Sequence, residues 1–344
     1  MRPNNLDLTR LLLAMTVFLG HVFFLSHQPE LRLLGYFDGS FAVSGFFSIS
    51  GFLIFASYER SSSLRDYFSR RAMRILPGYW ASTLLCVAIA VAFSRSFHVA
   101  KFVFANLTFT NFFALGVPGV FTHNPQDSAL NGSLWTIKIE IAFYIIVPMV
   151  VWLCRRLKRD AVLISITAMS VAYQFALAPR HLTLSYQLPG QMGFFCVGAL
   201  AYYHLSTFRK VGVWMVLPAL AAYVGYKYTG WFILSLVSIP VIVLCFGLLT
   251  PETKKVTKWG DFSYGIYVLH YPILQTIIAL GLFHRFPLAA FLLSVAIVCA
   301  SAIFSWFVIE RPCLVFAHRS RPTTSPAEPI EIFERSTNEV PTAT

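Results

Sequence analysis

Ten long apolar runs constrain the fold of this chain of 344 residues more than any other feature. A helix needs about 17–25 apolar residues to cross the hydrocarbon core of a bilayer. Only 12% of the residues are charged, well below the roughly 25% that is usual in soluble domains. We therefore predict an all-α integral membrane protein, a bundle of about ten transmembrane helices. The runs lie at about 8–26, 40–58, 76–94, 133–153, 161–178, 187–204, 211–226, 231–249, 262–283 and 287–309.

The basic residues predict how these helices are oriented, because cytoplasmic loops of membrane proteins carry an excess of Lys and Arg. With a cytoplasmic N-terminus and ten crossings, 20 of the 27 Lys and Arg residues fall on the cytoplasmic side and six in the outer loops. The C-terminus is then cytoplasmic as well. The same bias explains the net charge of +12 without a nucleic-acid partner, since the basic residues cluster between apolar runs.

One further segment, 102–121, is apolar but is predicted not to cross the membrane. Asn and Pro residues interrupt it, and an eleventh crossing would place the basic sequence RRLKR at 155–159 on the outer side. We expect an interfacial or re-entrant segment that packs on protein. Residues 1–317 then form one transmembrane domain. Residues 318–344, rich in Pro, Ser, Thr and Glu, are predicted to form a disordered cytoplasmic tail.

Several other classes of protein fit the sequence poorly. The first apolar run lacks the small-residue cleavage site of a signal peptide. The six Cys show no CxxC spacing, and most lie in apolar runs, where a thiol acts as a small hydrophobe. The nine His show no metal-binding spacing such as HExxH. We expect neither a disulfide framework nor a metal site.

The first apolar run, LDLTRLLLAMTVFLGH, carries two ionisable residues on one helical stripe, Arg10 and His21. Eleven residues return to nearly the same face of a helix, about 16 Å along its axis. Ionisable groups at membrane depth are costly and often mark substrate or proton paths. Arg10 either contributes to such a path or extends to the cytoplasmic headgroups. His21 is either a proton acceptor or a structural histidine between two helices.

A basic amphipathic segment at 64–77 contains Arg70, Arg71 and Arg74, and we expect its helix to end near Pro77. Arg71 and Arg74 are three residues apart, so their guanidinium groups share a helix face. Two such groups suit bidentate recognition of phosphate. The alternative is ordinary positive-inside charge or the binding of anionic membrane lipids.

Two later apolar runs also carry ionisable residues. In SLWTIKIEIAFY, Glu140 and Tyr144 share a helix face, and a carboxylate within a span needs a partner or stays protonated. Glu140 is therefore either a functional-site residue or one partner of an interhelical salt bridge. In FSYGIYVLHYPI, His270 lies one turn into the ninth run and serves either a site or packing. The small residues of SGFFSISGFLI in the second run predict close helix packing.

Together and in order, five of these blocks resemble the membrane-bound acyltransferase-3 family, which O-acylates bacterial surface glycans and related molecules. The blocks are LDLTRLLLAMTVFLGH, GFFSISGFLI, SRRAMRILPGYW, SLWTIKIEIAFY and SYGIYVLHYP, and they span residues 6–272. Any one block is weak, but five in the right order with the ten-helix layout are strong.

The resemblance implies a role for each candidate residue. The family's essential first-helix histidine falls on His21, and its companion arginine on Arg10. Its cytoplasmic arginine pair falls on Arg71 and Arg74. With Arg10, that pair is expected to hold the phosphates of an acyl-CoA donor, most simply acetyl-CoA. The family's glutamate falls on Glu140, which is expected to orient His21 or the acceptor. Its ninth-helix histidine falls on His270, expected to be a second polar group of the catalytic site.

The resemblance also implies a multi-pass protein of the bacterial cytoplasmic (inner) membrane that acylates a saccharide or lipid-linked glycan on the outer side. Some members of the family carry an outer esterase-like domain, but only about 34 residues follow the last run here. The chain is therefore expected to work alone or to hand its acyl group to a separate protein. Buried charges and a basic cytoplasmic face would equally suit a transporter or flippase for a lipid-linked saccharide or an anion, which is the alternative function.

Overall fold

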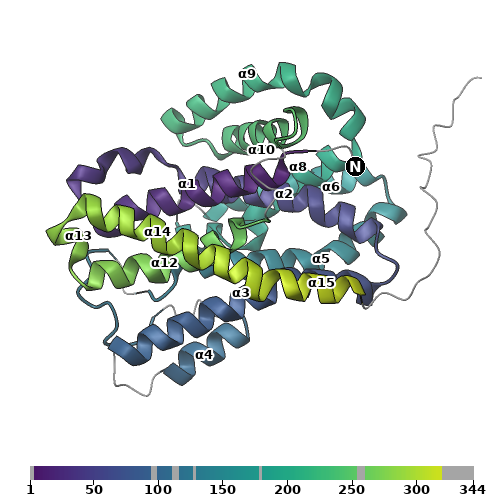
Figure 1. Cartoon of the computed structure of the whole chain (residues 1–344). Helices are drawn as coiled ribbons and strands as arrows, with labels where there is room; N and C mark the ends of the chain where they lie inside the picture. The colour runs from purple at the N-terminus through teal and green to yellow at the C-terminus, as the bar shows by residue number, and fades with distance from the viewer. Residues whose placement is uncertain are drawn as a thin grey trace, which may run out of the picture.

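The computed structural model describes residues 4–93, 99–110, 116–126, 129–177, 180–253 and 260–319, and no strand occurs in these ranges (Figure 1). Most of the tail predicted at 318–344 lies outside them. The first half of the described chain forms α1 (Leu6–Ser26), η1 (Pro29–Tyr36), α2 (Gly39–Glu59), α3 (Leu64–Phe93), α4 (Val99–Leu107), η3 (Gly132–Leu134), α5 (Trp135–Arg156) and α6 (Arg159–Leu177). The second half forms α7 (Leu182–Ser185), α8 (Leu188–Tyr203), α9 (Leu205–Thr229), α10 (Phe232–Leu249), α12 (Ser263–Ala279), α13 (Leu282–Arg285), α14 (Pro287–Ser305), η4 (Trp306–Glu310) and α15 (Arg311–Arg319).

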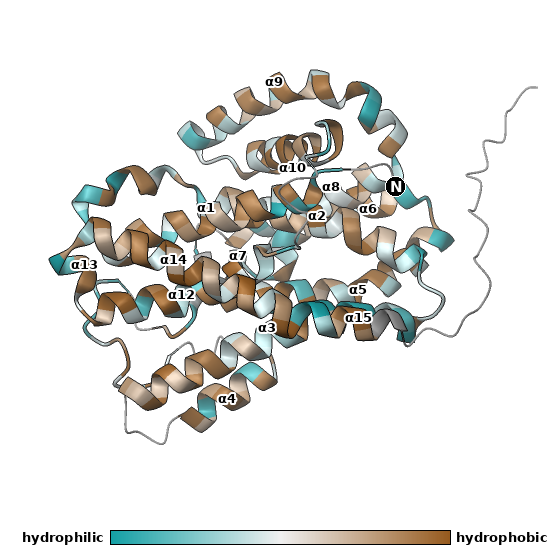
Figure 2. Cartoon of the chain, viewed as in Figure 1, coloured by the Kyte–Doolittle hydropathy of each residue, from teal (hydrophilic) through white to brown (hydrophobic). Residues whose placement is uncertain are grey.

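Every one of the ten predicted runs contains a helix: α1, α2, α3, α5, α6, α8, α9, α10, α12 and α14. Seven helices of the described residues are long and apolar enough to cross a membrane. Apolar residues cover most of their length, and hydrophilic residues gather toward the helix ends and connections (Figure 2). These features are those of a multi-pass membrane protein.

The expectation that a helix ends near Pro77 is wrong. The basic segment and the third apolar run form a single helix of 30 residues, α3, with Pro77 inside it. Proline interrupts one backbone hydrogen bond, but membrane helices tolerate it where neighbouring groups compensate. Pro77 leaves the Met73 carbonyl without its helical donor, and the neighbouring contact seen near it is to another carbonyl, that of Ile75, which accepts a hydrogen bond of 2.8 Å from the Tyr264 hydroxyl of α12. Arg70, Arg71 and Arg74 are therefore fixed to the same rigid element as the membrane-embedded part of α3.

The ambiguous segment 102–121 forms no single long helix in its described part. Its helix, α4, has nine residues and rises about 13 Å, well short of a bilayer core. α4 packs on α3, at the edge of the molecule farthest from α9 (Figure 1). Residues 111–115 lie outside the described ranges, so the choice between an interfacial and a re-entrant segment stays open.

α12 is the central helix of the bundle. It packs against α1, α3 and α14, and every residue from Ser263 to Gln275 is buried. α1 and α12 run side by side in the same direction, because Arg10 contacts Asp261 near one end and His21 contacts His270 farther along. This pairing places the ionisable residues of two distant sequence blocks along one helix–helix contact.

The prediction of close packing around the second run is confirmed. α2 and α8 meet through Gly51 and Gly198, without side chains between their backbones. A Cβ atom on Gly51 would lie 1.9 Å from the Phe195 carbonyl oxygen, and one on Gly198 would lie 2.0 Å from the Ser48 carbonyl oxygen. Small residues at such contacts are how membrane helices approach one another closely.

Candidate active site

His21 and His270 form a direct pair between α1 and α12. Nδ1 of His21 lies 2.9 Å from Nε2 of His270, and the two rings stack at 21° with centroids 5.1 Å apart. His270 is fully buried, whereas His21 is only partly buried. Tyr271 packs edge-on against the His21 ring, and Phe18 against the His270 ring. Aromatic contacts on both rings restrict their rotation.

The hydrogen bonds of the histidine pair determine which nitrogen atoms carry protons. Nδ1 of His270 lies 3.0 Å from the Ile266 carbonyl oxygen, which can only accept, so this nitrogen is the donor. In neutral His270, Nε2 is then an acceptor, and Nδ1 of His21 must donate to it. Nε2 of His21 is left with a free lone pair, and it has no hydrogen-bond partner in the described part of the chain. The pair thus holds one imidazole ready to accept a proton.

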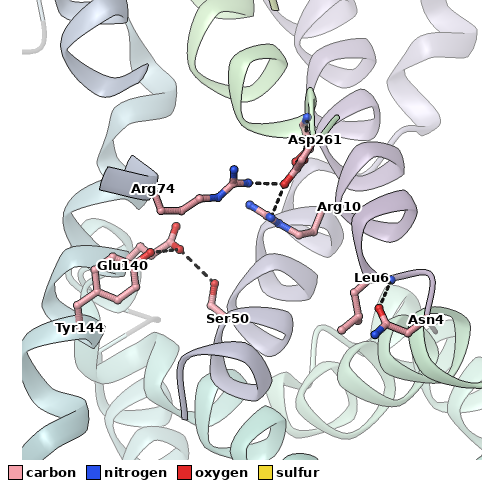
Figure 3. Close-up of polar contacts among 9 residues, drawn as sticks. Asn4, Leu6, Arg10, Ser50, Arg74, Glu140, Tyr144 and Asp261 are labelled. Carbon is pink, nitrogen blue, oxygen red and sulfur yellow. Dashed lines mark hydrogen bonds and ion pairs between the residues drawn. The ribbon is translucent and has the colours of Figure 1, made fainter. Parts of the chain in front are cut away.

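A second polar group lies at the other end of α1, where Arg10 and Arg74 share one carboxylate, that of Asp261 (Figure 3). Nη1 of Arg10 donates to Oδ2 of Asp261 over 2.6 Å, and Arg74 donates to the same oxygen. Oδ1 accepts hydrogen bonds from the backbone N–H and the hydroxyl of Ser263. Burial opposes ionisation of Asp261, but Arg10, Arg74 and the Ser263 hydrogen bonds lower its pKa to about 2. This carboxylate is therefore ionised throughout the physiological pH range.

Glu140 lies beside this cluster rather than beside His21. Its Oε1 accepts a hydrogen bond of 2.8 Å from the Tyr144 hydroxyl and a longer one of 3.5 Å from Ser50 (Figure 3). Among the described residues Glu140 forms no ion pair, so the salt bridge considered for it is not observed. The structure likewise gives no contact through which Glu140 would orient His21. Its position leaves it facing the cavity described below.

Arg71 and Arg74 share a helix but reach different partners. Arg71 donates to the Ser57 hydroxyl over 3.0 Å, and its guanidinium lies 5.8 Å from the centre of the Tyr144 ring. Its Nε is buried without a hydrogen-bond partner in the described residues. Arg70 differs, because it pairs with Asp66 of its own helix at 2.7 Å. Of the three arginines of this block, Arg71 therefore lies near Tyr144 and Arg74 contacts Asp261.

A small cavity lies beside Arg10, and one of its lining residues, Tyr267, contacts His270. It has a volume of about 30 Å³, and Arg10, Glu140, Tyr264 and Tyr267 are among its lining residues. The Tyr267 ring, whose hydroxyl shares a hydrogen bond with Thr136, lies 6.1 Å from the His270 ring. This volume holds one or two water molecules. A long substrate can occupy the path only if side chains move apart.

The structure therefore brings the predicted residues together as two groups, with Arg10, Arg71, Arg74 and Glu140 at one end and His21 and His270 at the other. Sequence reasoning missed Asp261, which lies 251 positions from Arg10. The available signal was an acidic residue, in WGDFSYG, directly before a run predicted to start on the same side as Arg10. It also missed Glu310, a buried carboxylate within electrostatic range of Arg74.

Comparison with known proteins agrees with the resemblance in the sequence blocks. Residues 4–310 match a family described as an acyltransferase domain, the acyltransferase-3 family. An O-acetyl transferase of Shigella phage Sf6 is 30% identical over 339 residues, which cover 94% of this chain and 99% of that protein. No solved structure matches the chain.

Two further relatives come from rhizobia. Nodulation protein 10 of Rhizobium leguminosarum bv. viciae is 28% identical, over 90% of this chain and 93% of that protein. The exopolysaccharide production protein ExoZ of Rhizobium meliloti (strain 1021) is 24% identical, over 84% of this chain and 94% of that protein. Each of these alignments covers at least 84% of this chain and at least 93% of the relative. The chain therefore belongs to the acyltransferase-3 family and is a membrane O-acyltransferase.

Proposed function

We propose that this O-acyltransferase moves an acyl group, most simply acetyl, from a cytoplasmic acyl-CoA to a hydroxyl of a saccharide outside the cytoplasmic membrane. The proposed acceptor class is an exopolysaccharide, an O-antigen or a related glycan. The name of the exopolysaccharide production protein supports a saccharide acceptor, and that of the phage O-acetyl transferase supports acetyl transfer. The observation that carries the proposal is the pairing of α1 with α12. Along this contact, the arginine cluster and the free Nε2 of His21 lie about 16 Å apart along the axis of α1.

In this proposal the two groups divide the work. Arg10, Arg71 and Arg74 hold the phosphates of the coenzyme, because guanidinium groups bind phosphate through paired hydrogen bonds. The long, thin pantetheine arm then lies along α1 with its thioester near His21. Glu140 lines the cavity on this path and is placed to orient the arm or the groups around it.

Two chemical steps fit the geometry of His21. As a general base, Nε2 takes the proton of the acceptor hydroxyl while the hydroxyl oxygen attacks the thioester carbonyl. The C–S bond then breaks, and the proton passes to the departing thiolate. As a nucleophile, Nε2 itself attacks the carbonyl and the C–S bond breaks, so that the coenzyme leaves as a thiolate and an acyl-imidazole forms. The acceptor oxygen then attacks the acyl carbon, the C–N bond breaks, and the hydroxyl proton passes to the thiolate. In both steps His270 is the positioning residue, since its Nε2 holds the Nδ1–H of His21.

The proposal predicts a graded response at His270. We expect His270→Ala to lower acyl transfer by roughly 10- to 100-fold, less than the full contribution of a general base. We expect His270→Gln to recover part of the loss, because an amide oxygen can accept the same proton from His21. Initial rates at saturating donor measure both variants. Equal rates for His270→Ala and wild type would contradict the positioning role.

The direction of transfer requires the proposed topology of ten crossings with both termini in the cytoplasm. A reporter fused after Arg159, the first residue of α6, is expected to give a cytoplasmic signal, because the RRLKR sequence is retained there. A fusion after Arg180, at the far end of α6, is expected to read outside. Alkaline phosphatase and fluorescent-protein fusions measure the two positions. An outer-side signal after Arg159 would overturn the ten-helix topology.

Reconstituted protein tests the proposed function directly. Proteoliposomes with labelled acetyl-CoA on one side are expected to consume the thioester only when the donor faces the arginine cluster, and to transfer the label when a saccharide is present on the other side. Empty vesicles give the background rate. Saccharide translocation without use of the thioester would instead favour a transporter.

A further inference from the structure

Arg10 and Arg74 form a phosphate-binding fork that is already occupied by a side chain. Both guanidinium groups donate to the same oxygen of Asp261, and Ser263 occupies the other oxygen. The side chains are only 18%, 16% and 11% exposed for Arg10, Arg74 and Asp261. The N–H groups with which Arg10 and Arg74 converge on one oxygen are therefore taken by Asp261, and a phosphate can bind both arginines at this point only if the carboxylate moves.

The carboxylate of Asp261 is needed as a counter-charge because the two arginines are largely buried. Two guanidinium groups without a counter-charge would be costly in a buried site, because charges repel and lose their hydration. Asp261 supplies that counter-charge while no acyl-CoA is bound. A diphosphate offers more negative charge and more oxygen atoms than one carboxylate, so it can replace Asp261 on both arginines.

We propose that Asp261 is a placeholder anion, which occupies the arginine fork in the empty enzyme and is displaced by the phosphates of the donor. The inference rests on the proposed acyl-CoA donor. The cavity beside Arg10 and Ser263 has a volume of only about 30 Å³, so the donor can enter here only if the surrounding side chains move. The return of Asp261 to the fork then helps to release free coenzyme A after each turnover.

The displacement gives Asp261 an effect opposite to that of a scaffold. A scaffold holds the arginines in place for the donor, so its removal weakens donor binding. A placeholder competes with the donor, so its removal strengthens binding. Asp261 stays ionised at physiological pH, since its pKa is about 2, and protonation therefore cannot relieve the competition.

Asp261→Asn separates the two roles. We expect its KM for acetyl-CoA and its Kd for free coenzyme A to fall about tenfold, a factor equal to about 1.4 kcal/mol. We also expect coenzyme A to raise the Tm of this variant more than that of wild type. Asp66→Asn is the matched control, because it removes a carboxylate from Arg70 on the same helix without touching the fork, and its KM should not change.

Ser263→Ala provides a second test if Asp261→Asn does not fold. It keeps the charge but removes the hydroxyl that holds Oδ1, so KM should fall in the same direction by a smaller factor. An unchanged or raised KM in a folded variant would overturn the placeholder role, but it would not contradict acyl-CoA as the donor. A wild-type protein that neither binds coenzyme A nor uses acetyl-CoA would instead overturn the proposed donor, and the inference with it.

Discussion

His21→Ala is expected to lower acyl transfer by about 10²- to 10⁴-fold, the range that a positioned general base contributes. The reason is geometric, because Nε2 of His21 is the imidazole nitrogen of the pair that is left free to accept a proton. His270 is not expected to replace it, because its ring is fully buried and held by the Ile266 carbonyl, and its Nε2 lies one imidazole ring away from the position of the His21 Nε2. Thioester consumption and acceptor labelling by the purified variant measure the effect.

His27→Asn is a suitable control for this experiment. His27 is an exposed residue that follows α1, and its φ of 50° suits asparagine. The activity of the His27→Asn variant should match that of wild type. Turnover by His21→Ala at the wild-type rate would remove His21 from the chemistry. Wild-type protein denatured rapidly at neutral pH after a pulse of labelled acetyl-CoA distinguishes the two mechanisms, because label on His21 indicates an acyl-imidazole and its absence at steady turnover indicates a general base.

The positions of the helices were predictable because, in a membrane, the local sequence alone determines which segments form helices. Any long apolar run must satisfy its backbone hydrogen bonds internally, so it becomes a helix wherever it packs. For this reason α1, α5 and α10 coincide with predicted runs to within a few residues. The continuation of α3 through Pro77 was not predictable in the same way, because a hydroxyl from α12, far along the chain, contributes to stabilising that region.

The candidate site was predictable only in part. Arg10 and His21 are neighbours on one helical stripe, and spacing within a helix is readable from sequence. Their partners come from α12, and no spacing rule connects residues about 250 positions apart. The family resemblance supplied His270 as a candidate but not its contact with His21. No sequence pattern pointed to Asp261. Glu140 was expected to orient His21 or the acceptor; it lines a cavity together with Arg10 and has no contact with His21 among the described residues.

The placement of α12 links the fold to the chemistry. A helix that is buried along 13 consecutive residues, Ser263 to Gln275, cannot exchange its side chains with lipid or water. Its polar residues must therefore be satisfied by neighbouring helices, and His270 and Ser263 are satisfied by hydrogen bonds. The same constraint that makes buried polar groups costly thus fixes the geometry of both ends of the proposed path.

Gly198→Ala is expected to destabilise the protein by at least about 2 kcal/mol, toward the upper part of the range for overpacked cores. The new Cβ would lie 2.0 Å from the Ser48 carbonyl oxygen of α2, and a backbone atom cannot rotate away as a flexible side chain does. α2 and α8 would have to separate, which would also disturb the stacking of Phe143 on Phe195 beside Gly198. Thermal unfolding in detergent and the yield of monodisperse protein measure the loss.

Gly225→Ala makes this prediction specific to the α2–α8 contact. Gly225 also lies inside a helix, α9, but its Cβ would meet only one side-chain atom, at an ordinary distance of 3.4 Å. Alanine favours the helix there by about 0.5–1 kcal/mol, so this variant should be as stable as wild type or slightly more stable. Opposite signs for the same Gly-to-Ala change would show that backbone contact, rather than helix propensity, decides the outcome. Equal stability of the two variants would mean that α2 and α8 are not in such close contact.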